Sequence, residues 1–374
     1  MIDKLLDPNN ILFWFLIISI IAIAIAIISR PFSTYIKFVY PNAKFEAIGN
    51  PYIQAKELDN LTESKNLTSF KEILNSSKDY NILGEKTENI QQSLDENFVK
   101  TIKMMKEDSS KKMNYFFDIY LQKSDISLIK SIIISKIQNQ EVDEKILDEV
   151  VTDKNKTIIN KLYNSDKKEI PVILKKFGFN ENIIKITKME KPDLLQLDKE
   201  LNKSFINELK NIKVPYKCNQ GKQRFVKILT DINNVKNVLR AKELNYEKSI
   251  FQHLFISEGL EIPLWKFKDL AESDSVSQII NNLEGTSYYE PLKNVIEDYN
   301  KERSVQVLEI ALDNYYLKCI RDISNQNYTN IGPTIRYLVS KEFEIRNLKI
   351  ITKGISEELN KEYIKKYLVM EDIL

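Results

Sequence analysis

A nine-residue pattern occurs three times in this chain of 374 residues, at nearly equal intervals. The copies begin at Leu94, Leu201 and Leu312. Each consists of Leu, then Asp or Asn, two variable positions, an aromatic residue, an aliphatic residue, two variable positions and a final aliphatic residue. Such internal similarity restricts the fold strongly, because each copy is expected to adopt the same local structure.

A second pattern follows each copy of the first after about 35 positions. It consists of an aliphatic residue, Lys or Arg, any residue and another aliphatic residue, and it begins at Ile129, Val235 and Ile345. The linked patterns recur about every 110 residues. Tetratricopeptide and HEAT repeats have periods of only about 34 to 47 residues. The spacing therefore predicts three homologous domains and not a solenoid.

The apolar positions of both patterns have the spacing of α-helices, since residues four apart lie on one side of a helix. We interpret them as inner faces of packed helices, in preference to ligand-binding residues. With only 8 Gly and 10 Pro, a turn-dense β-fold is disfavoured, and we predict an all-α protein. The predicted repeat core comprises Leu94, Phe98, Ile102, Leu201, Phe205, Leu209, Leu312, Tyr316 and Ile320.

The repeats also suggest domain boundaries. We place an N-terminal segment at residues 1–39 and three helical domains at residues 40–140, 141–250 and 251–374. Within the last domain, Gly332-Pro333 and Lys353-Gly354 are expected to mark helix ends, because a Gly after a basic last turn suits a helix C-terminus.

The N-terminal segment contains one long apolar run, with no charged residue from Ile11 to Ser29. At about 1.5 Å per residue, a helix of this length covers roughly 28 Å, close to the thickness of the hydrocarbon core of a bilayer. We predict a transmembrane helix over about 11–29. A helix that is apolar on all sides could also pack inside a ring of other membrane helices.

A cleaved signal peptide is the alternative for this run. It is disfavoured because the preceding residues include Asp3 and Asp7 beside Lys4, whereas a secretory leader begins with a basic region. Three basic residues follow the run, namely Arg30, Lys37 and Lys44. By the positive-inside rule, the large C-terminal part is expected on the cytoplasmic side of the membrane.

Charge and rare residues exclude several functions. The formal net charge is +2, which gives no general electrostatic basis for nucleic-acid binding. Cys218 and Cys319 form no CxxC pair, so no disulfide framework is expected. The single histidine, His253, is expected near a helix surface and makes a histidine metal site or a catalytic triad improbable.

Motifs for phosphate, dinucleotide, zinc-protease and serine-hydrolase chemistry are absent. We therefore predict no catalytic, cofactor-binding or metal-binding residues and no small-molecule substrate. Tyr40 and the pair Tyr288-Tyr289 either mark an interface or belong to the core, and we favour the core.

Several segments resemble a known family. Residues 40–48 (YPNAKFEAI) and 344–354 (EIRNLKIITKG) are similar to the N-terminal and C-terminal phrases of the C subunit of archaeal A-type ATP synthases. Residues 283–289 (LEGTSYY) and the closing Leu368-Val369 also resemble that family. The sequence departs from its pattern at Glu46, where Arg is usual, and at residues 49–51 (GNP), which interrupt a usually helical stretch.

The resemblance implies a non-catalytic central-stalk subunit of an A-type or V-type ATP synthase. It implies three similar helical domains in a funnel with a pseudo-threefold axis. It also implies that the funnel sits on the membrane rotor ring and receives the central-shaft subunits of the D and F type, coupling ion flow to ATP synthesis. The coupling ion, proton or sodium, would bind in other subunits.

Partner contacts can be suggested at single residues. Arg346, Lys349 and Lys353 are candidates for a partner-facing surface, and a solvated helix face is the alternative. For the whole chain, the alternative function is a membrane-anchored helical scaffold or signalling protein unrelated to ATP synthase.

Overall fold

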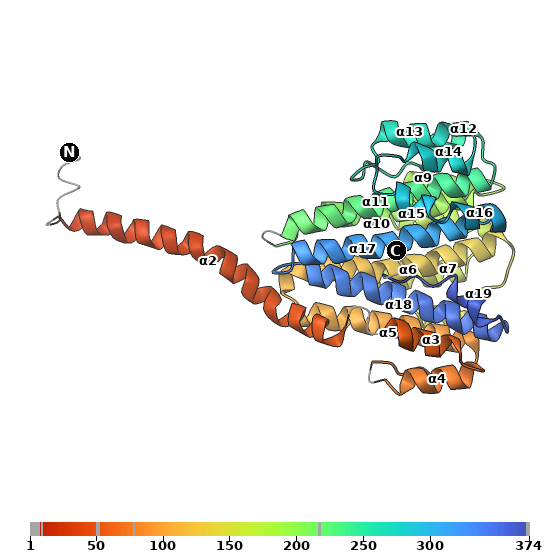
Figure 1. The fold of residues 1–374 in the computed structure, drawn as a ribbon, viewed down its shortest axis with the longest axis horizontal. Coiled ribbons are helices and arrows are strands. Elements are labelled where there is room, and N and C mark those ends of the chain that lie inside the picture. Colours follow the sequence, from red (N-terminus) through yellow and green to blue (C-terminus); the bar gives the residue numbers. More distant parts are fainter. Residues whose placement is uncertain (1–7, 9, 50–52, 78, 216–217, 372–374) are drawn as a thin grey trace.

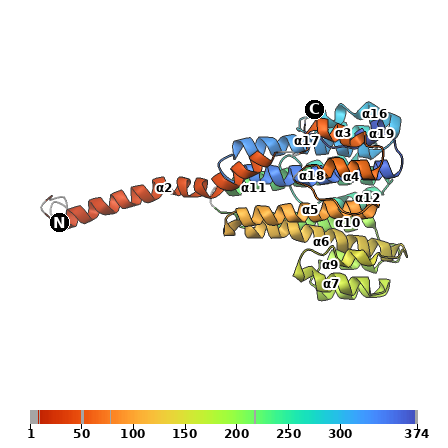
Figure 2. The ribbon, with the colours of Figure 1, turned by 90° about the horizontal axis from the view of Figure 1, so that it is seen from below.

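The computed structural model describes residues 8, 10–49, 53–77, 79–215 and 218–371. Within these residues the secondary structure consists of helices without strands, which confirms the prediction of an all-α fold. A long N-terminal helix, α2, projects from one end of a helical body that begins at residue 53 (Figures 1 and 2).

Three pairs of long helices form the centre of the body. They are α5 (Thr87–Asp108) with α6 (Asn114–Ile137), α10 (Leu194–Asn211) with α11 (Cys218–Glu243), and α17 (Val305–Gln326) with α18 (Gly332–Ser356). The first sequence pattern lies on the first helix of each pair and the second pattern lies on the second helix. The two patterns keep a nearly constant separation in sequence because they mark the apolar faces along which the two helices of a pair pack against each other.

The six long helices form a closed bundle. Each packs against the next in the order α5, α6, α10, α11, α17 and α18, and α18 packs against α5 again. The three turns between paired helices lie at the end of the body from which α2 projects (Figure 1).

Short helices connect the pairs. α7 (Asp153–Tyr163), α8 (Ile170–Lys176) and α9 (Glu181–Lys188) lead into α10, and α12 (Lys248–Phe251) to α16 (Ile296–Glu302) lead into α17. α3 (Ala55–Thr62) and α4 (Leu67–Asn75) lead into α5. Each group packs on the second helix of a pair: α7 on α6, α13 (Leu264–Glu272) and α14 (Val276–Asn282) on α11, and α3 and α4 on α18. The group before α17 also contains α15 (Tyr289–Lys293), and α19 (Lys361–Lys365) follows α18.

The apolar run lies in α2 (Ile11–Ile48), and Ile11–Ser29 is the one stretch within the described residues that is long and apolar enough to cross a membrane. None of that stretch is buried in the body. The helix is longer than the run, so the suggested boundary at residue 39 falls inside it. Its other half reaches the body and ends at Gly49, whose φ of 114° is accessible to glycine at low cost.

One expected helix end is displaced. Gly332 begins α18, as its sequence suggested, but Gly354 lies within this helix, which continues to Ser356. A Cβ atom at Gly354 would lie 2.5 Å from the side chain of Ile364 in α19. The glycine therefore allows α19 to pack closely on α18 and does not end the helix.

Candidate functional site

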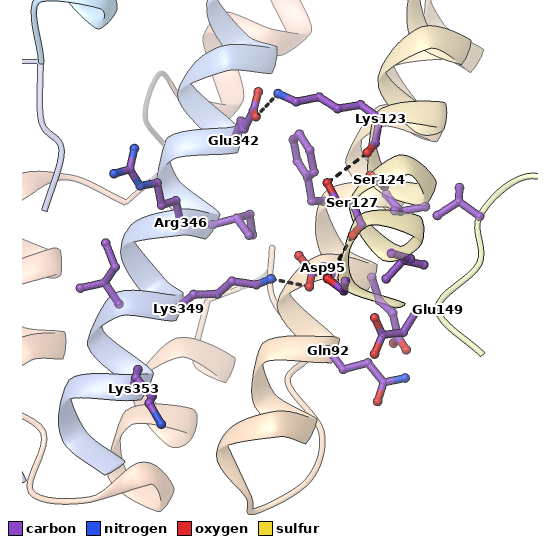
Figure 3. Close-up of a pocket in the computed structure, with 18 of the residues that line it drawn as sticks. Gln92, Asp95, Lys123, Ser124, Ser127, Glu149, Glu342, Arg346, Lys349 and Lys353 are labelled. Carbon is purple, nitrogen blue, oxygen red and sulfur yellow. Dashed lines mark hydrogen bonds and ion pairs between the residues drawn. The ribbon is translucent and has the colours of Figure 1, made fainter. Parts of the chain in front are cut away.

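A cavity of about 1150 Å³ lies inside the bundle between α5, α6 and α18. Its lining runs along α5 from Gln92 to Lys103, along α6 from Tyr120 to Ser131 and along α18 from Glu342 to Gly354, and it continues to Tyr367 beyond α18 (Figure 3). Because paired helices are antiparallel, Gln92 and Lys353 lie away from the turns, whereas Lys103 and Tyr120 lie closer to them. The cavity therefore extends along the bundle and reaches the end of the body opposite to α2.

The three candidate residues of the sequence, Arg346, Lys349 and Lys353, all line this cavity from α18 (Figure 3). Nη1 of Arg346 lies 2.6 Å from a carboxylate oxygen of Asp313 on α17. Lys349 forms an ion pair with Asp95 on α5. Lys353 pairs with Glu357, the residue that follows α18, at 2.7 Å on the exposed rim. Two of the three cations therefore join neighbouring helices, and one remains on the rim.

The opposite wall contributes further charges. Lys123 of α6 forms an ion pair with Glu342 of α18 across the cavity (Figure 3). Glu149, in the segment after α6, also lines it. Burial, and then the nearby carboxylate of Asp95, raise the pKa of Glu149 above its usual range. The cavity thus presents both signs of charge on walls that different helix pairs contribute.

Ion pairs continue through the interior of the bundle. The buried carboxylate of Asp313 also binds Nζ of Lys236 on α11, at 2.5 Å. On the same helix, Arg240 binds Glu309 of α17, with Nε–Oε1 at 2.5 Å. Asp198 of α10 forms ion pairs with Arg240 of α11 and with Lys130 of α6. Charged side chains therefore link all three helix pairs.

This network was not predicted from the sequence, although the repeated patterns contain a signal for it. Lys130, Lys236 and Arg346 occupy the same position of the second pattern, and Asp95 and Asp313 the same position of the first. Charged residues between apolar positions usually face solvent. Recurrence of one sign at one position indicates instead a face that all three pairs direct inward.

Aromatic rings fill the bundle beside a second, smaller cavity of about 150 Å³. Tyr120 of α6 meets Phe205 of α10 edge to face, with ring centroids 5.4 Å apart. Tyr316 of α17 contacts Phe343 of α18 in a similar way, at 6.1 Å. Nζ of Lys123 lies 4.9 Å from the centroid of Phe205, a favourable position for a cation over a ring.

The nine proposed repeat-core residues lie on these helices, and all except Phe98 are buried. Phe98 is half-buried because it lines the large cavity. Tyr288 is buried, whereas Tyr40 is exposed on α2. The buried residues of the set are Leu94, Ile102, Leu201, Phe205, Leu209, Leu312, Tyr316 and Ile320.

We examined the described residues for metal-binding and nucleophilic side chains. Within the described residues, no group of three or more His, Cys, Asp or Glu side chains could hold a metal ion. His253 is exposed and lies outside the cavity lining. Cys218 is buried, and burial raises the pKa of its thiol to about 11, so the thiol is protonated at neutral pH. The cavity lining combines charged side chains with the rings of Phe98 and Tyr120.

An all-α protein with three related helix pairs, a charged interior and a long apolar N-terminal helix is the class that this structure defines. The chain belongs to the ATP synthase (C/AC39) subunit family, whose sequence model matches residues 41–367. This confirms the resemblance seen in the sequence.

Named relatives cover nearly the whole chain. It is 28% identical to the C subunit of the A-type ATP synthase of Methanobrevibacter smithii over 357 residues, which span 91% of this chain and 90% of that protein. It is 26% identical to the corresponding C subunit of Pyrococcus horikoshii over 346 residues, or 89% and 90% of the two chains. Identity reaches 35% with that of Methanocaldococcus jannaschii, over 147 residues that span 39% and 37%.

Proposed function

We propose that this protein is a non-catalytic central-stalk subunit of an A-type ATP synthase. It joins the membrane rotor ring to the central-shaft subunits of the D and F type, so that ion flow drives ATP synthesis or ATP hydrolysis drives pumping. The complex lies in the cell membrane, with the body of this subunit on the cytoplasmic side. Nucleic acid and small-molecule substrates have no part in this function.

One observation carries the proposal: the apolar helix leaves the body at one end, and the charged cavity extends to the other end. Asn42 of α2 donates hydrogen bonds from Nδ2 to the carbonyl oxygens of Tyr328 and Asn330, each at 3.0 Å, and so meets the turn between α17 and α18. The cavity is lined at the other end, by residues such as Lys353. A subunit that links a membrane ring to a shaft requires two such separate attachment points.

A coupling element also has to resist twisting. The ion pairs Lys236–Asp313 and Arg240–Glu309 join α11 to α17, which belong to different pairs, and the carboxylate of each is largely buried. Buried pairs of this kind are costly to break, because a partner left alone remains charged in a poorly solvated place. Such contacts between helix pairs stiffen the bundle, which supports the transmission of torque.

The cavity gives the proposed shaft contact a specific test. We expect Arg346→Glu and Lys349→Glu together to reduce co-purification of the D-type and F-type shaft subunits from native membranes, because like charges then face Asp313 and Asp95 and the cavity wall changes sign. Recovery of the membrane ring should change little. Lys366→Glu, on the surface beside Glu302, is the matched control and should leave both unchanged.

Wild-type purification tests the broader proposal. Rotor-ring, shaft and catalytic-head subunits are expected together with the tagged chain. If none of them is recovered under conditions that preserve a membrane complex, the central-stalk function is wrong, and a membrane-anchored scaffold becomes the better explanation.

A further inference from the structure

An exposed apolar face lies on α2 between the apolar run and the body. It consists of Phe32, Tyr35, Ile36, Val39 and Tyr40, whose side chains are 41–68% exposed. Their spacing of three or four residues places them on one side of the helix. We call this set the exposed stripe. Figures 1 and 2 show that α2 projects beyond the body before its C-terminal end reaches the other helices.

The other side of α2 is already occupied. Phe38, Asn42 and Phe45 are buried, and the ring of Phe45 stacks on Tyr337 with centroids 5.1 Å apart and planes 3° from parallel. Lys44 forms an ion pair with Asp108 of α5 at 2.6 Å. These contacts fix the rotation of the helix, so the exposed stripe cannot turn toward the body.

Helix geometry places part of the exposed stripe outside the lipid. From Ser29, at the end of the apolar run, Ile36 lies about 10 Å and Tyr40 about 16 Å further along the helix axis. The headgroup layer of one leaflet is only about 5 to 8 Å thick. A typical tilt of about 20° shortens these distances by only about 6%. If Ile11–Ser29 spans the bilayer, lipid therefore leaves Ile36 and Tyr40 uncovered.

We propose that the exposed stripe is a docking surface for membrane-embedded protein helices that extend past the headgroups and pack along α2. The stripe continues directly from the run Ile11–Ser29, which the body leaves wholly uncovered. A partner helix can therefore follow α2 from the bilayer to the body. This inference rests on the proposed function, in which those helices belong to the membrane rotor ring.

The contact would depend on shape and apolar surface, because the exposed stripe has no charged member. Its location also explains why these residues remain apolar outside the membrane. Side chains at Ile36 and Tyr40 that faced only water would gain nothing from large apolar groups, whereas burial of such groups is the main source of affinity between helices.

Photo-crosslinking in native membranes tests this contact directly. Photo-reactive benzoylphenylalanine replaces Ile36 or, separately, Tyr40 in the full-length tagged chain. Val172, a similarly exposed aliphatic residue of α8 on the body, is the control position. We expect a covalent adduct with a membrane-embedded polypeptide at positions 36 and 40, and none with it at position 172. Mass spectrometry identifies the polypeptide.

Substitutions supply a second measurement. The double variant Ile36→Asp/Tyr40→Asp should lower recovery of that polypeptide in detergent by about tenfold or more, since two large side chains lose their burial. Val172→Asp should not lower it. Far-UV circular dichroism and thermal unfolding should stay unchanged in both variants, because the altered side chains are exposed.

The outcomes separate the docking surface from the proposed function. Adducts with lipid alone at positions 36 and 40, while ATP synthase subunits still co-purify with the chain, would overturn the docking surface and keep the central-stalk function. An adduct with a membrane polypeptide that belongs to no ATP synthase would support the docking surface and overturn the central-stalk function.

Discussion

Two of the three helix pairs hold their neighbouring short helices in one way, and the third pair does so in another. Asp125 on α6, Asp231 on α11 and Lys341 on α18 occupy equivalent positions, each five residues before the basic residue of the second pattern. All three are buried. Each binds the segment of chain that leads to the next pair around the bundle, but the third has the opposite charge.

The two aspartates bind backbone N–H groups of the segment that leads to the next helix pair. The carboxylate of Asp231 accepts hydrogen bonds from the N–H groups of Leu260, Glu261 and Ile262, at 2.8, 2.8 and 3.1 Å, and from the hydroxyl of Tyr288 at 3.0 Å. Its closest backbone partner is 29 residues away in sequence. The continuous chain after α11 keeps residues 260–262 close to Asp231. Their N–H groups have to be paired when they are buried, and the carboxylate is the acceptor.

Asp125 repeats this arrangement in the first pair. Its carboxylate accepts from the N–H groups of Val151 and Thr152, at 2.8 and 3.1 Å, and from Nδ2 of Asn155 at 3.1 Å. These partners surround the start of α7. The first two connections of the bundle are therefore both covalently continuous and held by a buried carboxylate.

Lys341 instead binds side chains, and two of its partners, Asp79 and Tyr80, lie near the other end of the sequence. Its Nζ lies 2.5 Å from Asp79 and 2.8 Å from Glu344, and it donates to the hydroxyl of Tyr80 at 2.9 Å. Asp79 is 262 residues away. Glu344 also accepts from the backbone N–H of Ile53, at 2.9 Å. Where no peptide chain joins two pairs, buried ion pairs close the bundle.

The largest effect should come from breaking this closing contact. Lys341→Met leaves the carboxylates of Asp79 and Glu344 without their cation, and removing one partner of a buried pair costs about 3 to 5 kcal/mol. We expect that loss in the free energy of unfolding, measured in urea. Hydrogen exchange should rise first in α3 and α4, because Lys341 and Glu344 attach the flanking residues Ile53, Asp79 and Tyr80 to α18.

The variant Lys366→Met removes a surface cation beside Glu302 and serves as the control. It should leave both measurements close to wild type. Uniformly faster exchange throughout the body of Lys341→Met, with no early loss at α3 and α4, would contradict a local closing role for Lys341.

The second-largest effect is expected from a change at Asp231, whose carboxylate we call the Asp231 anchor. In Asp231→Asn, the amide nitrogen that replaces one oxygen faces backbone donors, so at least one hydrogen bond is lost and a donor is left buried. The expected cost is about 2 to 3 kcal/mol, with faster exchange confined to residues 258–264 and α13. Asp193→Asn is a suitable control, because this helix cap keeps an acceptor and is less buried. Equal disruption of α3 would contradict the separation of the anchors.

Hydroxyl deletion compares the two kinds of anchor with the same chemistry. Tyr80 donates to Glu344, and Tyr288 donates to Asp231. Tyr80→Phe and Tyr288→Phe each remove one hydrogen bond to a buried carboxylate, at about 1 to 2 kcal/mol, and Tyr80→Phe also removes one acceptor of Lys341. Thermal unfolding of both variants measures the loss. A null effect at Tyr80 with a clear effect at Tyr288 would indicate that the ion pairs alone close the bundle.

The sequence predicted the features that depend on local spacing. Apolar residues four apart, such as Leu94 and Ile102, determine which side of a helix is buried whatever the partner is, so the helix pairs could be foreseen. The choice of partner could not be foreseen, because Lys341 and Asp79 are far apart in sequence and resemble any surface pair. Gly354 was misjudged on local grounds, since its close contact with Ile364 depends on how the chain returns after α18. Tyr40, for which the core was favoured, is exposed on α2.

The cavity residues likewise include some that could be predicted from local sequence and some that could not. Arg346 and Lys349 stood out as basic residues on one helical face, and both line the cavity. Their partners Asp313 and Asp95 lie on other helices and could be recognised only by comparing the same position in the repeats. The domain arrangement around a pseudo-threefold axis came from the family resemblance and stays a prediction.

The smallest expected effect is a pH dependence that belongs to the Asp231 anchor. Burial raises the pKa of this carboxyl above its usual value, although the hydrogen bonds from Glu261 and Tyr288 oppose the shift. The folded state therefore holds the proton more tightly than the unfolded state does. The resulting stabilisation is fully present below the unfolded pKa of about 3.9 and is lost as the pH rises through the higher folded pKa. Asp231→Asn has no such titration, so the difference in unfolding free energy between wild type and variant should be widest in acid and should narrow as the pH rises. Urea titrations of both proteins across this range measure the difference. A gap that widens with rising pH would mean that the backbone donors outweigh burial and that the anchor favours its charged form.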